Sequence, residues 1–178
     1  MIKQVEEKEA KAEGDKARDN GKKGSRVVSA GFIVRSQGGK YLMGKTTKFP
    51  KKRCWTVFKG QQEEGESIIA TATRELKEEA GINILRSKNL QLSQSTTPFY
   101  SFSMKEKLVY LYLLDDTNGE LNDAEFSCNS YWGKDRLPEI CEHQWMTLDE
   151  MDKVIFPSQR GMVAFLRGSE LESNVISD

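Results

Sequence analysis

Hydrophobic and polar positions along the chain predict a series of strands. The β-branched run 26–34, RVVSAGFIV, is followed by the turn 36–39 and by 40–46, KYLMGKT, so these segments predict a hairpin. CWTVFKG (54–60) predicts a short strand, and the apolar run 107–115 fits a buried central strand. Weaker strands are expected at residues 82–85, 89–94 and 143–147, and an aromatic-containing loop or strand at 95–104.

The stretch 60–82, GQQEEGESIIATATRELKEEAGI, has a helical rather than an alternating pattern. Its apolar positions recur three and four residues apart, as they do on a helix that buries one face: Ile69, Ala72, Leu76 and Ala80. We expect this helix to run from about Ser67 to Ala80. Gly81 suits a left-handed residue at its C-terminal end.

Two further helices are predicted near the C-terminus. Thr147 can cap the segment TLDEMDKVI, because Glu150 occupies the capping-box position. Residues 158–172 have an amphipathic pattern whose apolar positions include Met162, Phe165 and Leu166. Strands outnumber helices and are separated by both turns and helices, so the expected fold class is α/β (α+β) with a mixed sheet.

Three glutamates crowd one side of the helix expected at 67–80. At about 100° per residue, Glu78 and Glu79 lie roughly 60° and 40° to either side of Glu75. Like charges at this spacing destabilise a helix by about 0.2–0.5 kcal/mol per pair. A hard divalent cation, which prefers carboxylate oxygens, is the obvious neutralising partner.

The same stretch resembles the Nudix box, G-x5-E-x7-R-E-U-x-E-E-x-G-U, where U is a bulky apolar residue. Every specified position is matched, by Gly60, Glu66, Arg74, Glu75, Leu76, Glu78, Glu79, Gly81 and Ile82. The resemblance covers about residues 26–170. It implies the Nudix α/β/α sandwich, in which a mixed β-sheet lies between helices, and a domain over 26–172.

The resemblance assigns roles to the charged residues of the box. Arg74 and Glu66 would form an ion pair that fixes the loop against the helix. The backbone carbonyl of Lys59, just before the box glycine, would add a metal ligand. The ligands for Mg²⁺ or Mn²⁺ would be the carboxylates of Glu75, Glu78 and Glu79.

Nudix enzymes commonly place one more glutamate on a loop, as a further metal ligand or as the general base. Glu139 and Glu142 both precede the last expected strand. In mRNA-decapping subunits and bacterial RNA pyrophosphohydrolases this glutamate lies six residues before a tryptophan, as Glu139 does before Trp145. The resemblance favours Glu139. His143, the only histidine, is either a proton carrier or base contact or, as we favour, a polar residue on a strand face.

Candidate substrate contacts lie in two loops. Lys59 belongs to WTVFKG, which resembles the W-x-x-P-K-G lead-in of dinucleoside tetraphosphatases and decapping enzymes, although Phe58 replaces the proline. The Lys59 ammonium would then meet a phosphate oxygen, helped by Arg53 or Lys52 of a basic loop. Trp132, in the polar context YWGKDR, is the preferred candidate for stacking on a nucleobase. The other aromatic candidates are Phe99, Tyr100, Phe102 and Tyr131.

Composition adds little on partners but bounds the organisation. The 178 residues fit one domain, and 27 basic against 27 acidic residues give no argument for bulk attraction to nucleic acid or membrane. Residues 1–25 mix seven basic with six acidic side chains without an aromatic residue, which predicts a charged flexible arm. Residues 173–178 are expected to be a frayed tail. Three cysteines without a CxxC pair, and no signal peptide or long apolar run, favour a cytoplasmic or nuclear protein without a membrane partner.

The resemblance therefore implies a divalent-metal-dependent pyrophosphohydrolase. Its substrate would be a capped or 5′-phosphorylated RNA end or a dinucleoside polyphosphate. The alternatives are a diphosphoinositol polyphosphate, which the basic stretch 48–53 would contact, and a non-catalytic Nudix-like module that binds a nucleotide or RNA. Decapping subunits normally carry a helical regulatory domain before the Nudix domain, and the arm 1–25 is too short for one. Nothing in the sequence indicates the oligomeric state.

Overall fold

The computed structural model describes residues 26–48, 52–93, 97–104 and 106–175, with side chains to residue 172. The arm expected at 1–25 lies outside the described residues, as does the part of the basic loop at 49–51. Of the tail expected at 173–178, the first three residues continue the last helix, so the chain remains helical further than we predicted.

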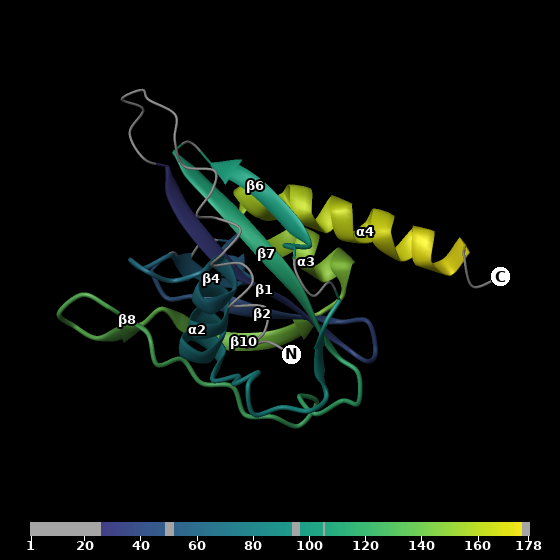
Figure 1. Cartoon of the computed structure of the whole chain (residues 1–178), viewed down its shortest axis with the longest axis horizontal. Coiled ribbons are helices and arrows are strands. Elements are labelled where there is room, and N and C mark those ends of the chain that lie inside the picture. The colour runs from purple at the N-terminus through teal and green to yellow at the C-terminus, as the bar shows by residue number, and fades with distance from the viewer. Residues whose placement is uncertain (1–25, 49–51, 94–96, 105, 176–178) are drawn as a thin grey trace.

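A mixed sheet forms the middle layer of the fold (Figure 1). Its central strands β1 (Val27–Ser36) and β7 (Lys107–Asp116) run parallel along their whole lengths. In the described residues the sheet has eight strands, and its main path is β10-β2-β1-β7-β5. The other strands of this sheet are β2 (Tyr41–Thr46), β3 (Trp55–Thr56), β4 (Phe58–Gln61), β5 (Leu90–Leu92), β6 (Tyr100–Met104) and β10 (Ile140–Met146).

Helices cover both faces of the sheet, which confirms the predicted sandwich. Helix α2 (Ile68–Ala80) packs on one face, while α3 (Leu148–Val154), the short η2 (Pro157–Gln159) and α4 (Arg160–Val175) lie on the other (Figure 1). The period of two along β1 directs Phe32 into the core under α2 and Ile33 into the core under α3 and α4. Each core is closed by apolar helix residues, Leu76 on the first face and Met162 on the second.

Strand β1 changes partner along its length, and this change shapes the functional end of the sheet. Val34 and Arg35 pair with β2, whereas Ser29 to Phe32 pair with β4. The end of β2 pairs with β3 and β10 rather than with β4. The ends of β2 and β4 line one cleft, together with the start of β10 at Ile140.

The predicted Gly81 cap of α2 and the predicted capping box of α3 are confirmed, and Ser67 forms an N-terminal cap on α2 that was not predicted. The Ser67 hydroxyl accepts the Ala70 N–H at 3.2 Å, and Gly81 ends α2 in the left-handed region at φ 74°. At α3, Thr147 and Glu150 form both hydrogen bonds of a capping box.

Two local predictions were wrong. Residues 82–85 form no strand, because the Asn83 side chain accepts the Leu85 N–H at 3.2 Å and its carbonyl accepts the Arg86 N–H at 3.1 Å, which makes a turn. Conversely, the polar segment after residue 130 contains a two-stranded hairpin, β8 (Tyr131–Trp132) and β9 (Leu137–Pro138), that the sequence did not predict. None of the helices in the described part of the chain is long and apolar enough to cross a membrane.

Candidate active site

Helix α2 carries three glutamates on the side that faces the cleft. Glu75 and Glu79 are buried, with 7% and 5% of their surface exposed, whereas the Glu78 side chain is 40% exposed. All three line the same cleft, whose volume is about 810 Å³. The helical spacing predicted from the sequence therefore places three carboxylates side by side.

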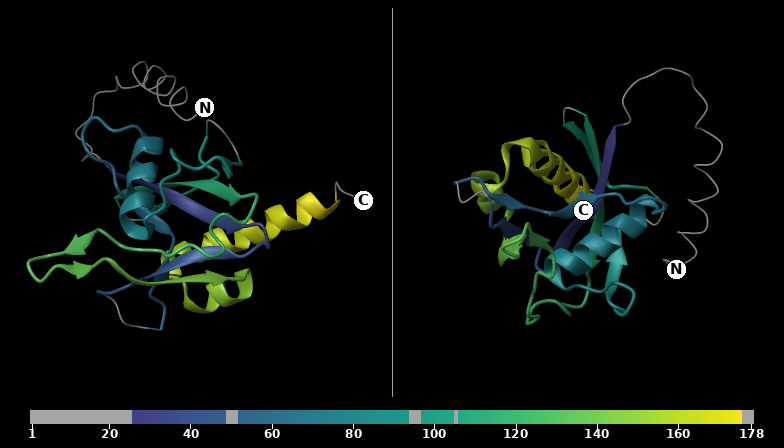
Figure 2. Two further views of the ribbon diagram at one scale, coloured as in Figure 1. Left: turned by 90° about the horizontal axis from the view of Figure 1, so that it is seen from below. Right: turned by 90° about the vertical axis from the view of Figure 1, so that its left-hand side faces the viewer.

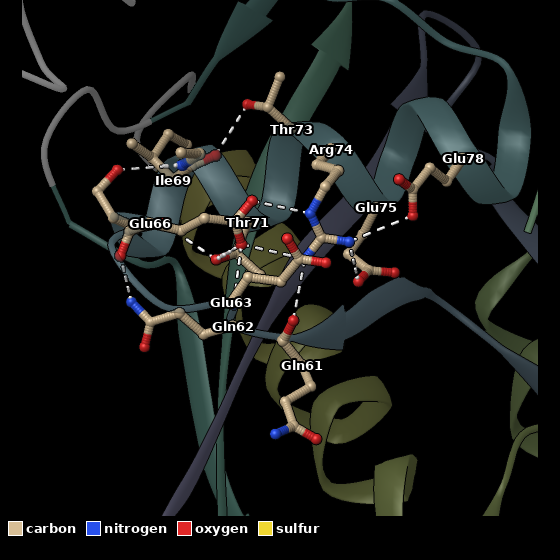
Figure 3. A network of polar contacts seen from close by, with 12 residues as sticks. Gln61, Gln62, Glu63, Glu66, Ile69, Thr71, Thr73, Arg74, Glu75 and Glu78 are labelled. Atoms are coloured by element: carbon tan, nitrogen blue, oxygen red, sulfur yellow. Dashed lines mark hydrogen bonds and ion pairs between the residues drawn. The ribbon is translucent and has the colours of Figure 1, made fainter.

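Arg74 holds two of these carboxylates, those of Glu75 and Glu78, in place (Figure 3). Its Nη1 donates to Glu75 Oε1 at 2.7 Å and to Glu78 Oε2 at 3.2 Å. Its Nε and Nη2 bind the two oxygens of Glu66 at 2.8 and 3.1 Å, and Nη2 also donates to the Gln61 carbonyl at 2.9 Å. One guanidinium thus joins the helix to the loop before it and to the end of β4, as its planar fork of donors permits.

Glu66 anchors the loop that precedes α2. Besides the two bonds from Arg74, its Oε2 accepts the Glu63 N–H at 3.0 Å and the Thr71 hydroxyl at 2.9 Å. These hydrogen bonds, chiefly those from Arg74, lower the pKa of Glu66 to about 2. The Arg74–Glu66 contact has the geometry that the sequence resemblance implied.

Gly60 leaves room for a carboxylate. A Cβ atom at this position would lie 2.0 Å from Glu75 Oε1, so any side chain there would displace the Glu75 carboxylate. Because β4 carries Gly60 directly beneath α2, the first glycine of the box and its central glutamate occupy complementary space.

The two buried carboxylates, those of Glu75 and Glu79, have too little positive charge around them to balance their own. The Lys59 N–H donates to Glu79 Oε2 at 2.7 Å, which fixes that carboxylate against β4. Burial nevertheless raises the pKa of Glu79 to about 8 and raises the pKa of Glu75. Burial also lowers the pKa of the neighbouring Lys59 ammonium. A cation bound here would favour the ionised carboxylates.

The donors fit a hard divalent cation, although they do not yet converge on one point. No three His, Cys, Asp or Glu side chains in the described ranges form a ready metal cluster. The reason is visible in the contacts, since Arg74 engages Glu75 and Glu78 while the Lys59 N–H engages Glu79. Carboxylate and carbonyl oxygens are the ligands that Mg²⁺ and Mn²⁺ prefer. Small side-chain rotations from these positions would present them to an ion.

The structure separates the two candidate loop glutamates. Glu139 lines the cleft and lies near enough to Glu75 and Glu79 to raise their pKa values by charge repulsion. Glu142 instead binds Lys45 at 2.8 Å on the exposed side of β10 and is not among the cleft-lining residues. The position favoured from the tryptophan spacing is therefore the one that the fold brings to the carboxylates.

The C-terminal end of α2 is fixed by contacts that the sequence did not reveal. Asn129 and Ser127 donate their N–H groups to the carbonyls of Glu78 and Ala80, at 2.6 and 3.3 Å. His143 Nε2 lies 2.7 Å from the carbonyl of Glu79. Carbonyls that a helix end normally leaves without partners are thus paired here, and the glutamates before them are held in position.

His143 is packed rather than exposed to the cleft. Its ring lies 5.8 Å from the ring of Phe58 and 5.7 Å from that of Phe126, between centroids. Burial lowers its pKa. The contacts favour the interpretation of His143 as a polar residue on a strand face, where it holds the backbone of α2.

The predicted substrate contacts are only partly brought together. Lys59 and Trp132 line the cleft. Arg53 does not, and its Nη1 donates to the Asp152 carbonyl on α3 at 2.7 Å, so the structure does not bring it together with the other candidates. Lys52 is exposed and is likewise absent from the cleft lining.

The other aromatic candidates lie elsewhere. Phe99 and Tyr100 pack with Phe165 of α4, at ring-centroid distances of 5.3 and 5.1 Å, and Phe102 packs beside Tyr100. Tyr131 is exposed on the β8–β9 hairpin.

Two further lysines line the cleft. Lys48 follows β2 and is the first residue of the basic stretch 48–53 that the sequence offered as a phosphate contact, whereas Lys107, which begins β7 and pairs with Val27 of β1, was missed. Lys107 lies in no motif, and the sheet pairing brings it to the carboxylates. Together with Lys59 these two lysines give one cleft both acidic and basic walls, which suits a polyphosphate with bound cations.

Comparisons with known proteins agree with this geometry. The sequence profile of the NUDIX domain matches residues 25–166. An Ap4A hydrolase of C. elegans, solved as a binary complex, superposes with a TM-score of 0.60 at 21% identity, covering 83% of this chain and 98% of that chain. The MutT protein of Methanosarcina mazei Go1 gives 0.55 at 19% identity, covering 81% and 94%. The E. coli dihydroneopterin triphosphate pyrophosphohydrolase gives 0.56 at 18% identity, covering 76% and 91%. No curated protein sequence matches the chain.

The Arg74–Glu66 pair predicts an acid-sensitive contribution to stability. The pKa of Glu66 is depressed on folding, so its contribution is present above its ordinary value of 4.5 and is lost as the pH falls toward 2. Glu66→Gln should lower the free energy of unfolding by about 2–3 kcal/mol at pH 7 and by less than half of that at pH 3. Urea unfolding of both proteins at the two pH values measures this difference.

The control for this experiment is Glu125→Gln, which removes an exposed carboxylate away from the cleft. It should change the free energy of unfolding by less than about 0.5 kcal/mol at either pH. If Glu66→Gln lowers the free energy of unfolding by the same amount at pH 3 and at pH 7, the ion pair does not account for the loss of stability.

Proposed function

Since the chain belongs to the Nudix family of hydrolases that act on phosphorus-containing anhydrides, we propose that it cleaves a diphosphate linkage next to a nucleoside with Mg²⁺ or Mn²⁺ as cofactor. The substrate is a capped or 5′-phosphorylated RNA end or a dinucleoside polyphosphate. The observation that carries this proposal is the cleft itself, where the carboxylates of α2 and of Glu139 face Lys59, Lys107 and an exposed tryptophan.

Each wall of the cleft has a distinct part in the proposed reaction. Divalent cations supply neutralisation of the phosphate oxygens and a more acidic water. Glu75, Glu78 and Glu79 hold those cations, while Arg74 positions Glu75 and Glu78 and the Lys59 N–H positions Glu79. Lys59 and the other cleft lysines bind the remaining phosphate oxygens. Such fixed charges stabilise the transition state because they are in place before the reaction begins.

Glu139 is the proposed proton acceptor. Its carboxylate comes from a loop rather than from α2, and it lies on the same cleft as the metal-binding face. The water oxygen bonds to phosphorus, the bridging P–O bond breaks, and the leaving phosphate keeps the electron pair of that bond. The proton of the water passes to Glu139.

The proposed class of substrate rests on Trp132, the exposed aromatic residue at the edge of the cleft. Trp132 lines the cleft with 39% of its surface exposed, which leaves a ring face available for a nucleobase. An Ap4A hydrolase shares the fold, which is consistent with a dinucleoside polyphosphate. A diphosphoinositol polyphosphate receives less support, because Arg53 is engaged with α3 and is not available as a phosphate contact.

A substrate panel tests the proposed reaction. When Mg²⁺ or Mn²⁺ is present, wild-type protein should release a nucleoside phosphate from capped RNA or a dinucleoside tetraphosphate, or phosphate or pyrophosphate from 5′-triphosphorylated RNA, and chelation should abolish this. Glu79→Gln should lower kcat by at least about 100-fold, because a cation ligand is lost while the amide oxygen still accepts the Lys59 N–H.

Mass spectrometry of the products in H₂¹⁸O identifies which phosphorus is attacked, and a thermal melt checks that Glu79→Gln is folded. The proposal fails if no compound of the panel, diphosphoinositols included, loses a phosphate bond. Near wild-type turnover by folded Glu79→Gln would contradict the assignment of Glu79 as a cation ligand.

The two loop glutamates provide a matched pair of variants. Glu139→Gln should lower kcat by about 100-fold or more, because it removes the proton acceptor while keeping the shape of the side chain. Glu142→Gln should leave kcat within about twofold, since an exposed ion pair contributes about 0–1 kcal/mol. Steady-state kinetics on one substrate compares them. Equal losses in both variants, or loss only in Glu142→Gln, would contradict the assignment of Glu139.

A further inference from the structure

The β8–β9 hairpin extends from the body of the domain beside the cleft (Figures 1 and 2). It exposes three large apolar side chains, Tyr131, Trp132 and Leu137, at 42%, 39% and 51% of their surfaces. A two-stranded ribbon gains little stability from exposing such residues. Their position therefore calls for a ligand rather than a packing explanation.

Each exposed aromatic ring of the hairpin is paired with a cation. Lys48 Nζ lies 4.8 Å from the centroid of the Trp132 ring, and Arg136 Cζ lies 4.9 Å from the centroid of the Tyr131 ring. Aromatic faces next to cations are the elements of proteins that bind single-stranded nucleic acid, because bases stack on the rings while phosphates meet the charges.

Arg136 also has an unusual backbone. It is the only residue other than glycine with positive φ in the described ranges, at φ 49°. This left-handed conformation disfavours any residue that carries a side chain and suits glycine. An arginine at this turn therefore costs stability that a glycine would save, which is the pattern expected of a side chain kept for contact with a ligand.

We propose that the β8–β9 hairpin and Lys48 form a binding site for the single-stranded RNA that continues from the reacting 5′ end. The inference rests on the proposed function and narrows it to the RNA substrate, because a dinucleoside polyphosphate ends at its second nucleoside and has no following phosphates to meet the basic turn. A base near the diphosphate stacks on Trp132, and the following phosphates meet the basic turn.

The charges of the turn complement such a chain. Lys134 and Arg136 flank one acid, Asp135, and all three are exposed. Lys48 adds a cation on the cleft side. The net charge of the hairpin turn is therefore positive, whereas the glutamates of α2 are proposed to bind the cations at the diphosphate.

The base of the hairpin is tied to the candidate proton acceptor. The Glu139 N–H donates to the Ser130 carbonyl at 2.8 Å, and the Thr47 N–H donates to the Glu139 carbonyl at 3.1 Å. RNA held by the hairpin and by Lys48 is thus fixed relative to Glu139 through backbone hydrogen bonds on both sides. The hairpin site would therefore increase the affinity of the protein for RNA and also align the 5′ end of that RNA with the carboxylates.

The test compares 5′-triphosphorylated RNAs of one and eight nucleotides in the full-length protein. Wild-type kcat/KM should be at least tenfold higher for the octamer. Trp132→Ala should reduce kcat/KM for the octamer by about 5- to 150-fold, the range for loss of one base stack, and Trp132→Phe should restore most of it. Arg136→Gly should reduce the octamer-to-mononucleotide ratio while the melting temperature stays equal or rises, because the turn is relieved.

Salt dependence separates phosphate contacts from a structural effect. Arg136→Gly should reduce the slope of log(kcat/KM) against log[salt] for the octamer by about 0.7, the value for one phosphate of a single strand. Lys153→Gln, which removes an exposed cation on α3, is the matched control and should change neither the ratio nor the slope.

A binding measurement keeps the inference testable apart from catalysis. Anisotropy of a labelled octamer with folded Glu79→Gln should show binding that Trp132→Ala and Arg136→Gly each weaken. If wild type cleaves the mononucleotide and octamer equally well and the hairpin variants bind RNA as tightly as their parent, the hairpin site is wrong while the proposed function stands. If RNA binds through the hairpin but no diphosphate is cleaved, the proposed function fails and the binding site remains.

Discussion

The fold of the cleft depends on one arginine surrounded by carboxylates. Arg74 contacts Glu66, Glu75, Glu78 and the carbonyl of Gln61, so a single positive charge offsets repulsion within the helix and joins it to its leading loop. Without this contact, buried like charges would favour separation or protonation of the glutamates. The arginine lets Glu75 and Glu78 remain adjacent on one helix, beside Glu79, where a bound cation would neutralise the rest of their charge.

The sheet forms the other side of the cleft and leaves space for the helix carboxylates. The change of partner along β1 opens an edge where Thr46 and Lys59 face each other across the cleft, and the lack of a side chain at Gly60 admits the Glu75 carboxylate. The loop before the β8–β9 hairpin pairs with the last carbonyls of α2. Helix α2, Glu139 and the rim of the cleft are therefore parts of one hydrogen-bonded unit, which would align the proposed substrate contacts at the rim with the reacting phosphorus.

Features set by local sequence were predictable, and features set by pairing were not. The helix with its Gly81 cap follows from periodicity and capping chemistry, and the spacing of its carboxylates follows from helical geometry. Glu139 needed the family resemblance, because no local pattern separates it from Glu142. Lys107 reaches the cleft only through parallel pairing with β1, and Arg53 leaves it because a carbonyl of α3 is within reach. Residues 82–85 carry apolar side chains that suit a strand, but Asn83 bonds its own backbone into a turn.

The role of Arg74 is the central claim, and Arg74→Lys tests it most directly. Lysine keeps the positive charge but replaces the planar fork with a single ammonium that cannot span Glu66, Glu75 and Glu78 together. Mn²⁺ binding, followed by electron paramagnetic resonance below the melting temperature of the variant, measures whether the carboxylates keep their arrangement. We predict an affinity at least about tenfold weaker than wild type, a change typical of losing contacts that orient metal ligands, with no such change in the exposed control Arg86→Lys. Equal Mn²⁺ affinity in Arg74→Lys and wild type would contradict the account.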